Sequence, residues 1–258
     1  MTQKVTTRVT GNIGEIVISN PERKNAMTYE MWRHLRISVE ELKANDYAKV
    51  VVVRGAGSTF VAGADISEFR TIRQTGTSGV EYDEAAEAAV LTLARIPKPT
   101  IAAIAGYCIG GGLSIATACD FQIADVDAKF QIPAARLGIS YPPRALERLI
   151  HLIGPANAKR LIFTAARIDA QSALSLGLIS EVAYNGVDLL VEELARSLAE
   201  NAPLSLHATK RLIEIILSKG DDLAEVGAQM SKMTLDSLDY SEALTAFEEG
   251  RKPNFQGR

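Results

Sequence analysis

The chain reads "YCIGGGLSIATACD" over residues 107–120, and this stretch decides how its fold is interpreted. An apolar run leads into Gly110, Gly111 and Gly112, and a helix-like pattern follows as far as Cys119. Because glycine has no Cβ, backbone N–H groups at this point can come close to a ligand. N–H groups at a helix start also lack partners within the helix and lie at its positive dipole end. The stretch therefore predicts an anion-binding turn between a buried strand and a helix, unless the glycines only permit close packing.

The anion could be a phosphate or an oxyanion that forms during a reaction. The phosphate motifs are missing, because the sequence has no Gly-Lys-Ser/Thr ending and no GxGxxG pattern, and Gly55-Ala56-Gly57 indicates only a turn. An oxyanion hole needs two fixed donors, and the loss of one costs about 3–4 kcal/mol of transition-state stabilisation. A second turn of small residues, in "FVAGADISEF" at residues 60–69, shifts the balance toward the oxyanion hole.

The composition is that of an ordinary globular protein. Its 258 residues suffice for one large domain or for a domain with a helical appendage, and 47% of them are hydrophobic and 23% charged. With a net charge of −3, no nucleic-acid or polyanionic partner is indicated. Cys108 and Cys119 have neither metal-ligand spacing nor a disulfide framework, so we expect no metal site and a reducing, cytoplasmic location.

No membrane segment is expected. The N-terminal "MTQKVTTRVT" has no apolar core and is therefore no signal peptide. Residues 100–119 carry no charge and are long enough to span a bilayer, but Gly110–Gly112 and several polar residues interrupt them. We interpret this segment as a buried strand, a turn and a buried helix.

Short strands and helices follow one another through the first half of the chain, which predicts an α/β fold with largely buried sheets. Thr28 is expected to cap a helix whose buried face begins at Met31. From about Pro142 onward almost everything is expected to be helical, and the best boundary separates a core of residues 1–200 from a helical segment of residues 201–258. The apolar residues of that segment need cover from the core or from another subunit. The expected strands are Val5–Val9, Ile13–Ile18, Val50–Val53, Thr100–Ala105, Phe121–Ala124 and Lys129–Ile132, with a flexible break at Gly76–Gly79, a helix at Glu81–Arg95, a helix from the glycines to Cys119, and helix starts at Pro155, Asp169 and Pro203.

Four stretches, in the order "NPERKNAM", "FVAGADI", "IPKPTIAAIAGYCIGGG" and "RKPNFQGR", together resemble the crotonase family, also called the enoyl-CoA hydratase/isomerase superfamily. The resemblance runs from about residue 5 to the end of the chain. It implies a crotonase-type spiral of ββα turns with a C-terminal helical segment that builds a trimer or a dimer of trimers. It also implies an acyl-CoA substrate, with no cofactor beyond the coenzyme A that belongs to this substrate.

In the family the thioester oxygen lies between two backbone N–H groups, which stabilise an enolate. Matched motif to motif, the resemblance implies that Ala64 and Gly111 donate these N–H groups. Without the resemblance, Arg23 and Lys24 would be plain surface charges. The last two residues of the following set would come from a neighbouring subunit. The resemblance assigns contacts with coenzyme A to Arg23, Lys24, Ala26, Ala62, Ala64, Asp65, Ile66, Ser67, Phe247 and Lys252.

The chain departs from the family's hydratases at two positions. Those enzymes resemble one another in using two glutamates to hold and deprotonate water, and the matching residues here are Ser114 and Ala134. A serine hydroxyl can form hydrogen bonds, but near neutral pH it is no general base without a partner. We therefore expect weak or absent hydration of crotonyl-CoA, although enoyl-CoA hydratase would be the default name.

Tyr141, in "RLGISYPP", suggests a different reaction. This stretch and the C-terminal "DYSEALTAFEEGRKPNF" resemble family members that decarboxylate methylmalonyl-CoA-like thioesters, although those members carry a histidine where this chain has Ala64. Decarboxylation needs no base, so Tyr141, helped by Ser114, would only orient the carboxylate. The alternative role for Tyr141 is packing at the rim of the site. Isomerisation is another reaction open to an enolate-stabilising site.

Several other readings remain open. Ser114 as the nucleophile of a thioester hydrolase lacks both a Gly-x-Ser-x-Gly elbow and an evident histidine partner. A catalytically silent acyl-CoA-binding homologue that kept the pocket is the alternative to an enzyme. The loop Arg70–Gly79 is expected to shape the acyl end of the pocket. Glu68 and Glu147 could face the site but are more simply solvated charges, and His34, His151 and His207 are expected to be structural or on the surface.

Overall fold

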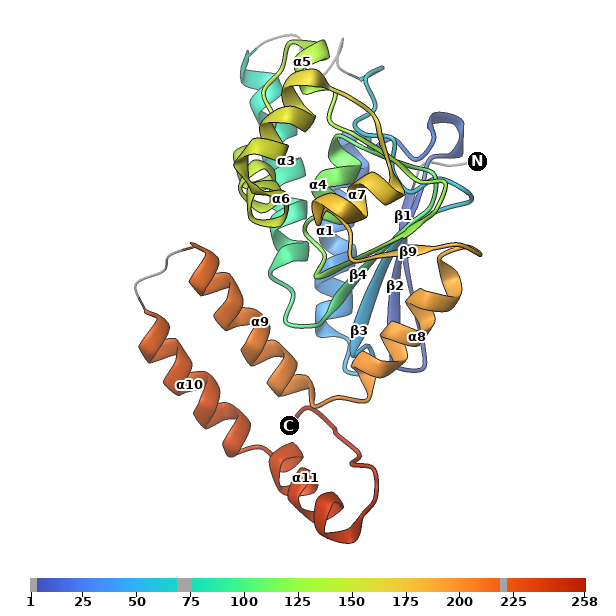
Figure 1. Cartoon of the computed structure of the whole chain (residues 1–258). Coiled ribbons are helices and arrows are strands. Elements are labelled where there is room, and N and C mark those ends of the chain that lie inside the picture. Colours follow the sequence, from blue (N-terminus) through green and yellow to red (C-terminus); the bar gives the residue numbers. More distant parts are fainter. Residues whose placement is uncertain (1–3, 69–75, 219–221) are drawn as a thin grey trace.

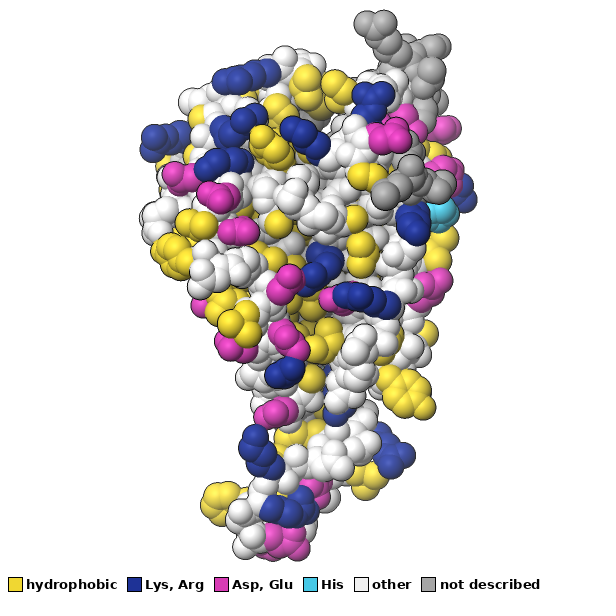
Figure 2. Space-filling model, turned by 90° about the vertical axis from the view of Figure 1, so that its right-hand side faces the viewer, with side chains coloured by type: hydrophobic (Ala, Val, Ile, Leu, Met, Phe, Trp, Pro, Cys, Tyr) yellow, Lys and Arg dark blue, Asp and Glu magenta, His cyan; other side chains and the backbone are white. Residues whose placement is uncertain are grey.

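A computed structural model describes residues 4–68, 76–218 and 222–258 of the chain (Figure 1). A twisted sheet is covered by helices on both faces, and three C-terminal helices extend away from it. This arrangement confirms the predicted α/β fold with C-terminal helices. The face shown in Figure 2 carries interspersed positive and negative side chains, as the near-neutral composition leads one to expect.

The main sheet has six strands in the order β1-β2-β3-β4-β6-β9. β1 and β2 form an antiparallel hairpin, and every later strand of this sheet pairs in parallel with its neighbour. The strands predicted from alternation lie within about two residues of the observed ones. The bounds are β1 Lys4–Thr10, β2 Ile13–Ser19, β3 Val50–Gly55, β4 Thr100–Ile104, β6 Phe121–Asp125 and β9 Glu181–Ala183.

The apolar strand β3 is buried on both faces of the sheet. Val51 and Val53 face the larger core, which also contains α1, whereas Val50 and Val52 face a second core beneath α8. A continuous run of valines suits such a strand, because neither face meets water.

The predicted helix start at Thr28 is confirmed, because its side-chain hydroxyl accepts a hydrogen bond from Met31 N–H at 3.2 Å. The predicted apolar face of this helix, α1, is buried. The helices are α1 Tyr29–Ala44, α3 Gly76–Ala94, α4 Gly111–Ala116, α5 Ala134–Leu137, α6 Pro143–Thr164, α7 Ala170–Leu176, α8 Asp188–Ala199, α9 Pro203–Ser218, α10 Leu223–Leu235 and α11 Leu238–Glu249, with a 3-10 turn at Pro21–Arg23.

Two helix boundaries differ from the expectation. The break expected at Gly76–Gly79 is wrong, because α3 already begins at Gly76. The helix expected to reach Cys119 is α4, which ends at Ala116, and the chain then turns back into β6. Glycine is a poor helix former in isolation, but packing against α1 overrides this preference in α3.

A second, small sheet was not expected from the sequence. It contains β5 Tyr107–Ile109, β7 Lys129–Gln131 and β8 Ile168–Asp169 in that order. Its strand β7 matches the strand expected at Lys129–Ile132. β5 and β8 contain three and two residues and show no readable periodicity, so they are recognised only by their pairing. The described part of the region after Pro142 is largely helical, as expected, with the short strands β8 and β9 as exceptions.

The helix starts expected at Asp169 and Pro203 are confirmed. Pro155 begins the second half of α6, because Gly154 interrupts the helix with φ 73°. Helices α9–α11 extend from the end of the sheet at which α8 stops (Figure 1). The division into a core of residues 1–200 and an oligomerisation segment stays a prediction. In the described part of the chain, no helix has the length and apolar character needed to cross a membrane.

Candidate active site

Each glycine of the "GGG" run has a different structural role. Gly110 adopts φ 53°, which favours glycine. A Cβ on Gly112 would lie 2.3 Å from the carbonyl oxygen of Val61, so this glycine permits close packing. A Cβ on Gly111 would lie 3.0 Å from Trp32 Cζ2 and 3.7 Å from the backbone nitrogen of Ala64. Gly111 therefore leaves space beside the Ala64 N–H, which is the other expected donor.

The geometry around Ala64 directs its N–H away from the neighbouring strand segment. Ala64 forms a parallel bridge with Met27, in which Met27 N–H donates to Gly63 O and Asp65 N–H donates to Met27 O, both at 2.8 Å. Alternate residues of an extended segment direct their N–H groups to opposite sides. Among the described residues, neither the N–H of Ala64 nor that of Gly111 has a hydrogen-bond acceptor. The two expected donors are thus close together and unused.

Both donors border a mostly apolar cavity of about 160 Å³. Trp32 from α1 forms part of its wall, and its indole N–H donates to the Tyr82 hydroxyl at 2.9 Å. That hydroxyl in turn donates to the Met27 carbonyl at 3.0 Å. The indole that restricts space around Gly111 is therefore held by α3 and by the Met27 segment.

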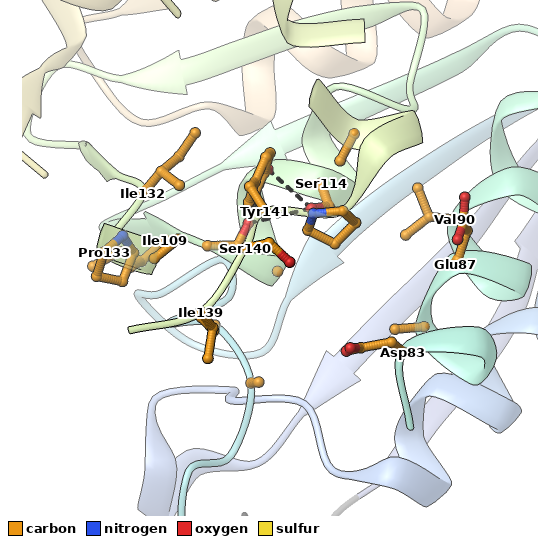
Figure 3. Close-up of a pocket in the computed structure, with 18 of the residues that line it drawn as sticks. Asp83, Glu87, Val90, Ile109, Ser114, Ile132, Pro133, Ile139, Ser140 and Tyr141 are labelled. Atoms are coloured by element: carbon orange, nitrogen blue, oxygen red, sulfur yellow. Dashed lines mark hydrogen bonds between the residues drawn. The ribbon is translucent and has the colours of Figure 1, made fainter. Parts of the chain in front are cut away.

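Ser114 and Tyr141 meet inside this cavity. Their hydroxyl oxygens are 2.9 Å apart, and Figure 3 shows this contact between the two walls of the pocket. Tyr141 also donates a long hydrogen bond, of 3.4 Å, to the Gly110 carbonyl. Burial raises the pKa of Tyr141, so its hydroxyl is neutral around pH 7 and can donate a hydrogen bond. The pair can orient a polar group, but neither hydroxyl is an evident base.

Ala134, the second position of departure, lies in the wall of the same cavity and is buried. It begins the short helix α5, and Ile132 and Pro133 just before it line the same side. This side of the cavity is therefore apolar in the described structure. A hydratase of the family would carry a carboxylate at the position of Ala134.

The opposite wall carries two carboxylates that sequence reasoning missed. Asp83 and Glu87 project from α3, one turn apart, and line the cavity together with Val90 (Figure 3). Helical spacing could have identified them, because it places both carboxylates on the face of α3 that lines the cavity. The residues of this face are Tyr82, Asp83, Ala86, Glu87 and Val90. Alanines occur on several sides of α3, so this face did not stand out from the hydrophobic pattern.

Arg148 from α6 also borders the cavity. Its Nε is buried, and among the described residues it has no hydrogen-bond partner. Burial lowers the pKa of this guanidinium, while Tyr141, Glu147 and Glu87 act in the opposite direction. A positive charge thus lies near the Ser114–Tyr141 pair and within electrostatic reach of Glu87.

The other ionisable candidates lie outside this arrangement. Glu147 forms an exposed ion pair with Arg144 at 3.1 Å, as expected of a surface charge. Glu68 accepts a hydrogen bond from Tyr29 N–H at 2.8 Å and so binds the first turn of α1, which corrects its interpretation as a plain solvated charge. His34 and His151 are exposed and His207 is half-buried, and in the described part of the chain no group of His, Cys, Asp and Glu could hold a metal ion.

The segment expected to contact coenzyme A is a rigid turn rather than a loose loop. Lys24 and Asn25 adopt φ values of 52° and 58°. The Asn25 side chain donates to the carbonyl oxygens of Ala56 and Thr59 at 2.9 and 2.7 Å. Lys24 accepts a hydrogen bond from Ala62 N–H, and its Nζ lies 4.6 Å from the centre of the Tyr107 ring. Arg23 and Ala26 flank this turn, with Ala26 buried.

The "AGADIS" segment presents main chain to the cavity. The Asp65 carboxylate is buried and accepts hydrogen bonds from the N–H and hydroxyl of Ser67, at 3.0 and 2.6 Å. It therefore fixes the turn, while Ile66 is 62% exposed at the edge of the cavity. Of the loop Arg70–Gly79, residues 70–75 lie outside the described residues, and the remainder is the start of α3.

Phe247 and Lys252 do not approach the cavity of their own chain. Phe247 lies on α11 and is 88% exposed, and Lys252 follows that helix. Figure 1 places α11 at the opposite end of the molecule from α4 and α5, which border the cavity. That these two residues contact a ligand bound to a neighbouring subunit stays a prediction.

Comparisons with known proteins give matches over nearly the whole chain. Residues 8–258 match the protein-family model described as enoyl-CoA hydratase/isomerase. The short-chain-enoyl-CoA hydratase of Clostridium acetobutylicum is 32% identical over 246 residues, which cover 94% of this chain and 93% of that protein. The peroxisomal Delta(3,5)-Delta(2,4)-dienoyl-CoA isomerase of Arabidopsis thaliana is 30% identical over 260 residues, which cover 95% and 92%. The crystal structure of an enoyl-CoA hydratase/carnithine racemase from Magnetospirillum magneticum superposes with a TM-score of 0.94 at 32% identity, covering 98% of this chain and 96% of that one.

Proposed function

Since the chain belongs to the enoyl-CoA hydratase/isomerase family, we propose that its cavity binds an acyl-CoA thioester and stabilises the enolate of that thioester. The thioester oxygen would lie between the N–H groups of Ala64 and Gly111. Both donors are fixed by the fold and lack other acceptors among the described residues, so they need no rearrangement as negative charge develops. This pair of unused, adjacent donors is the observation on which the proposal rests.

We do not expect this site to hydrate crotonyl-CoA efficiently. Hydration requires a group that removes a proton from water and a group that holds the water in place. Ser114 is occupied by the neutral Tyr141 hydroxyl, and Ala134 offers only a methyl group. An enolate-forming reaction that consumes no water, such as movement of a double bond, suits the cavity better.

Decarboxylation of a 2-carboxyacyl-CoA is the second candidate, supported by the contact between Ser114 and Tyr141. Two neutral hydroxyls, in a cavity that Arg148 also borders, could orient the substrate carboxylate. Loss of CO₂ would leave the electron pair in the enolate, and the proton that completes the product would come from water or from a side chain. No protein base is needed for the bond-breaking step.

The coenzyme A moiety would run along the rigid turn at residues 23–26 and the segment at residues 62–67. Phe247 and Lys252 of a second copy would complete this end, which agrees with their distance from the cavity of their own chain. No cofactor beyond coenzyme A is proposed. The two buried, unpaired thiols, Cys108 and Cys119, support a reducing compartment such as the cytoplasm.

The proposal is tested by turnover. Purified protein would be incubated separately with crotonyl-CoA, methylmalonyl-CoA and a 3-enoyl-CoA, and the products followed by mass spectrometry. We expect product from the 3-enoyl-CoA or the methylmalonyl-CoA and little from crotonyl-CoA.

Rapid hydration of crotonyl-CoA would show that this chain hydrates without glutamates at the positions of Ser114 and Ala134. Tight binding of all three thioesters without any product would support the silent binding homologue instead. Failure to bind any of them would contradict the assignment of the cavity to acyl-CoA.

A further inference from the structure

We propose that Glu87 is the catalytic acid/base of this cavity and moves a proton on the acyl chain of the bound thioester. The inference rests on the proposed function, because it needs an enolate held by Ala64 and Gly111. It assigns proton transfer to α3, and not to the positions of Ser114 and Ala134, which match the glutamates of the family's hydratases.

The position of Glu87 supports this role. Its side chain lines the same cavity as Ala64, Gly111 and Ser114 and is half-buried. Figure 3 shows Glu87 and Asp83 on α3 across the pocket from Ile132 and Pro133, with Ser114 and Tyr141 between the two sides. A carboxylate in this place can approach the acyl chain from the side that the hydroxyl pair leaves open.

The contacts of Glu87 distinguish it from the other carboxylates. Among the described residues it forms no hydrogen bond or ion pair, whereas Glu68 binds the start of α1 and Glu147 pairs with Arg144. Asp83 is exposed and takes part in another interaction. Glu87 is thus a partly desolvated carboxylate whose oxygens remain available to a substrate.

The charged groups around Glu87 suit a carboxylate that accepts and returns a proton. Arg148 on α6 lies within electrostatic reach, and Arg144, which also borders the cavity, is already paired with Glu147. Tyr141 contributes a neutral hydroxyl, so no second negative charge faces Glu87 from that side. The guanidinium of Arg148 is therefore the positive charge that acts on this wall of the cavity from α6.

The step needs no co-reactant. The Glu87 carboxylate takes a C2 proton from a 3-enoyl thioester, and the C–H electron pair passes into a dienolate whose oxygen is held by the two N–H groups. The carboxylic acid then returns the proton to C4, which leaves a 2-enoyl thioester and restores the carboxylate. No atom is gained or lost, and one carboxylate serves both halves of the reaction.

The test compares Glu87→Gln with Glu84→Gln, an exposed glutamate on the same helix that does not border the cavity. Both variants would be assayed for conversion of a 3-enoyl-CoA and for deuterium uptake at C2 of butyryl-CoA in D₂O. Binding of butyryl-CoA would be measured by calorimetry as a check on folding. We expect Glu87→Gln to lose about 100-fold or more in both rates while retaining binding, and Glu84→Gln to match the parent protein.

Unchanged exchange in Glu87→Gln would overturn the assignment. So would a parent protein that decarboxylates methylmalonyl-CoA but neither exchanges nor isomerises, and in that case the enolate proposal itself would stand. If binding is lost in Glu87→Gln, Glu87→Asp keeps the charge but withdraws it by one methylene. Retained binding with slower exchange in that variant supports the proposal, and exchange at the parental rate contradicts it.

Discussion

Gly111 carries the most direct prediction at the scale of single residues. A methyl group on Gly111 would enter the space beside the Ala64 nitrogen and press against Trp32. We expect Gly111→Ala to lower turnover of any substrate by about 100-fold or more, because a displaced donor forfeits about 3–4 kcal/mol of transition-state stabilisation. Turnover would be measured by mass spectrometry, and binding of coenzyme A by calorimetry should change much less.

A glycine elsewhere provides the matched control. A Cβ on Gly227, within α10, meets nothing within 4 Å, so Gly227→Ala adds the same methyl group without a clash. We expect this variant to retain full turnover. If Gly111→Ala folds and turns over as fast as the parent, the oxyanion role of Gly111 is wrong.

The sequence predicted a ligand-binding turn at Gly110–Gly112, but it did not predict the separate role of each glycine. Glycine allows positive φ, close packing and ligand approach, and the structure assigns these to Gly110, Gly112 and the surroundings of Gly111 respectively. Tyr141 was expected beside the site, and it lines the cavity with its hydroxyl 2.9 Å from that of Ser114. Glu87 was missed because a charged residue on an alanine-rich helix resembles a surface residue, and only the folded structure places it at a cavity.

At the scale of elements, strands and helices with clear periodicity were predicted, and most of the short ones were not. The valine run of β3 and the capped, amphipathic helix α1 can be recognised in the sequence, because their buried positions require apolar residues. β5, β8 and β9 contain two or three residues each, and they exist because neighbouring strands offer hydrogen-bond partners. Such pairing is a property of the assembled chain, and no local pattern encodes it.

The C-terminal end contains an ion pair from which we predict that the stability of the fold depends on pH. Arg251 forms two hydrogen bonds with the Glu242 carboxylate, at 2.6 and 2.9 Å, and Asn254 N–H donates to the same group. Arg251 first, and then Asn254, lower the pKa of Glu242 from 4.5 to about 2. The folded state therefore binds this proton more weakly than the unfolded state, so the stability that Glu242 contributes is present above about pH 4.5 and is lost as the pH falls through about 2.

We expect Glu242→Gln to lower the melting temperature near neutral pH, and the difference from the parent to shrink as the pH approaches about 2. Calorimetric scans of the two proteins across this range would measure it. Glu248→Gln, on an exposed neighbouring residue of α11, should leave the melting temperature unchanged. A difference that stays constant down to about pH 2 would contradict a role for the charged form of Glu242.

At the scale of the whole molecule, α9–α11 leave an apolar surface without cover in a single chain. Ile213, Ile216, Leu235, Leu238 and Phe247 all expose half or more of their side chains there. Exposed apolar side chains favour association, and we expect another copy of the chain to cover them. Self-association was expected from the sequence, because the apolar residues of this segment need cover from the core or from another subunit.

The same surface predicts that one subunit completes the site of another. A site variant, Gly111→Ala, keeps an intact tail, whereas a tail variant, Phe247→Ala with Lys252→Ala, keeps intact N–H donors. We expect each variant alone to turn over a limiting acyl-CoA slowly, the second because it has lost contacts with the coenzyme A moiety. When the two are co-expressed with different tags and purified as mixed oligomers, random assembly in a ring gives roughly a quarter of the sites intact donors together with an intact neighbouring tail. The activity of the mixed oligomers should then rise well above the mean activity of the two variants. Activity equal to that mean would show that the tail does not serve a neighbouring site, and an exposed α11 would need another explanation.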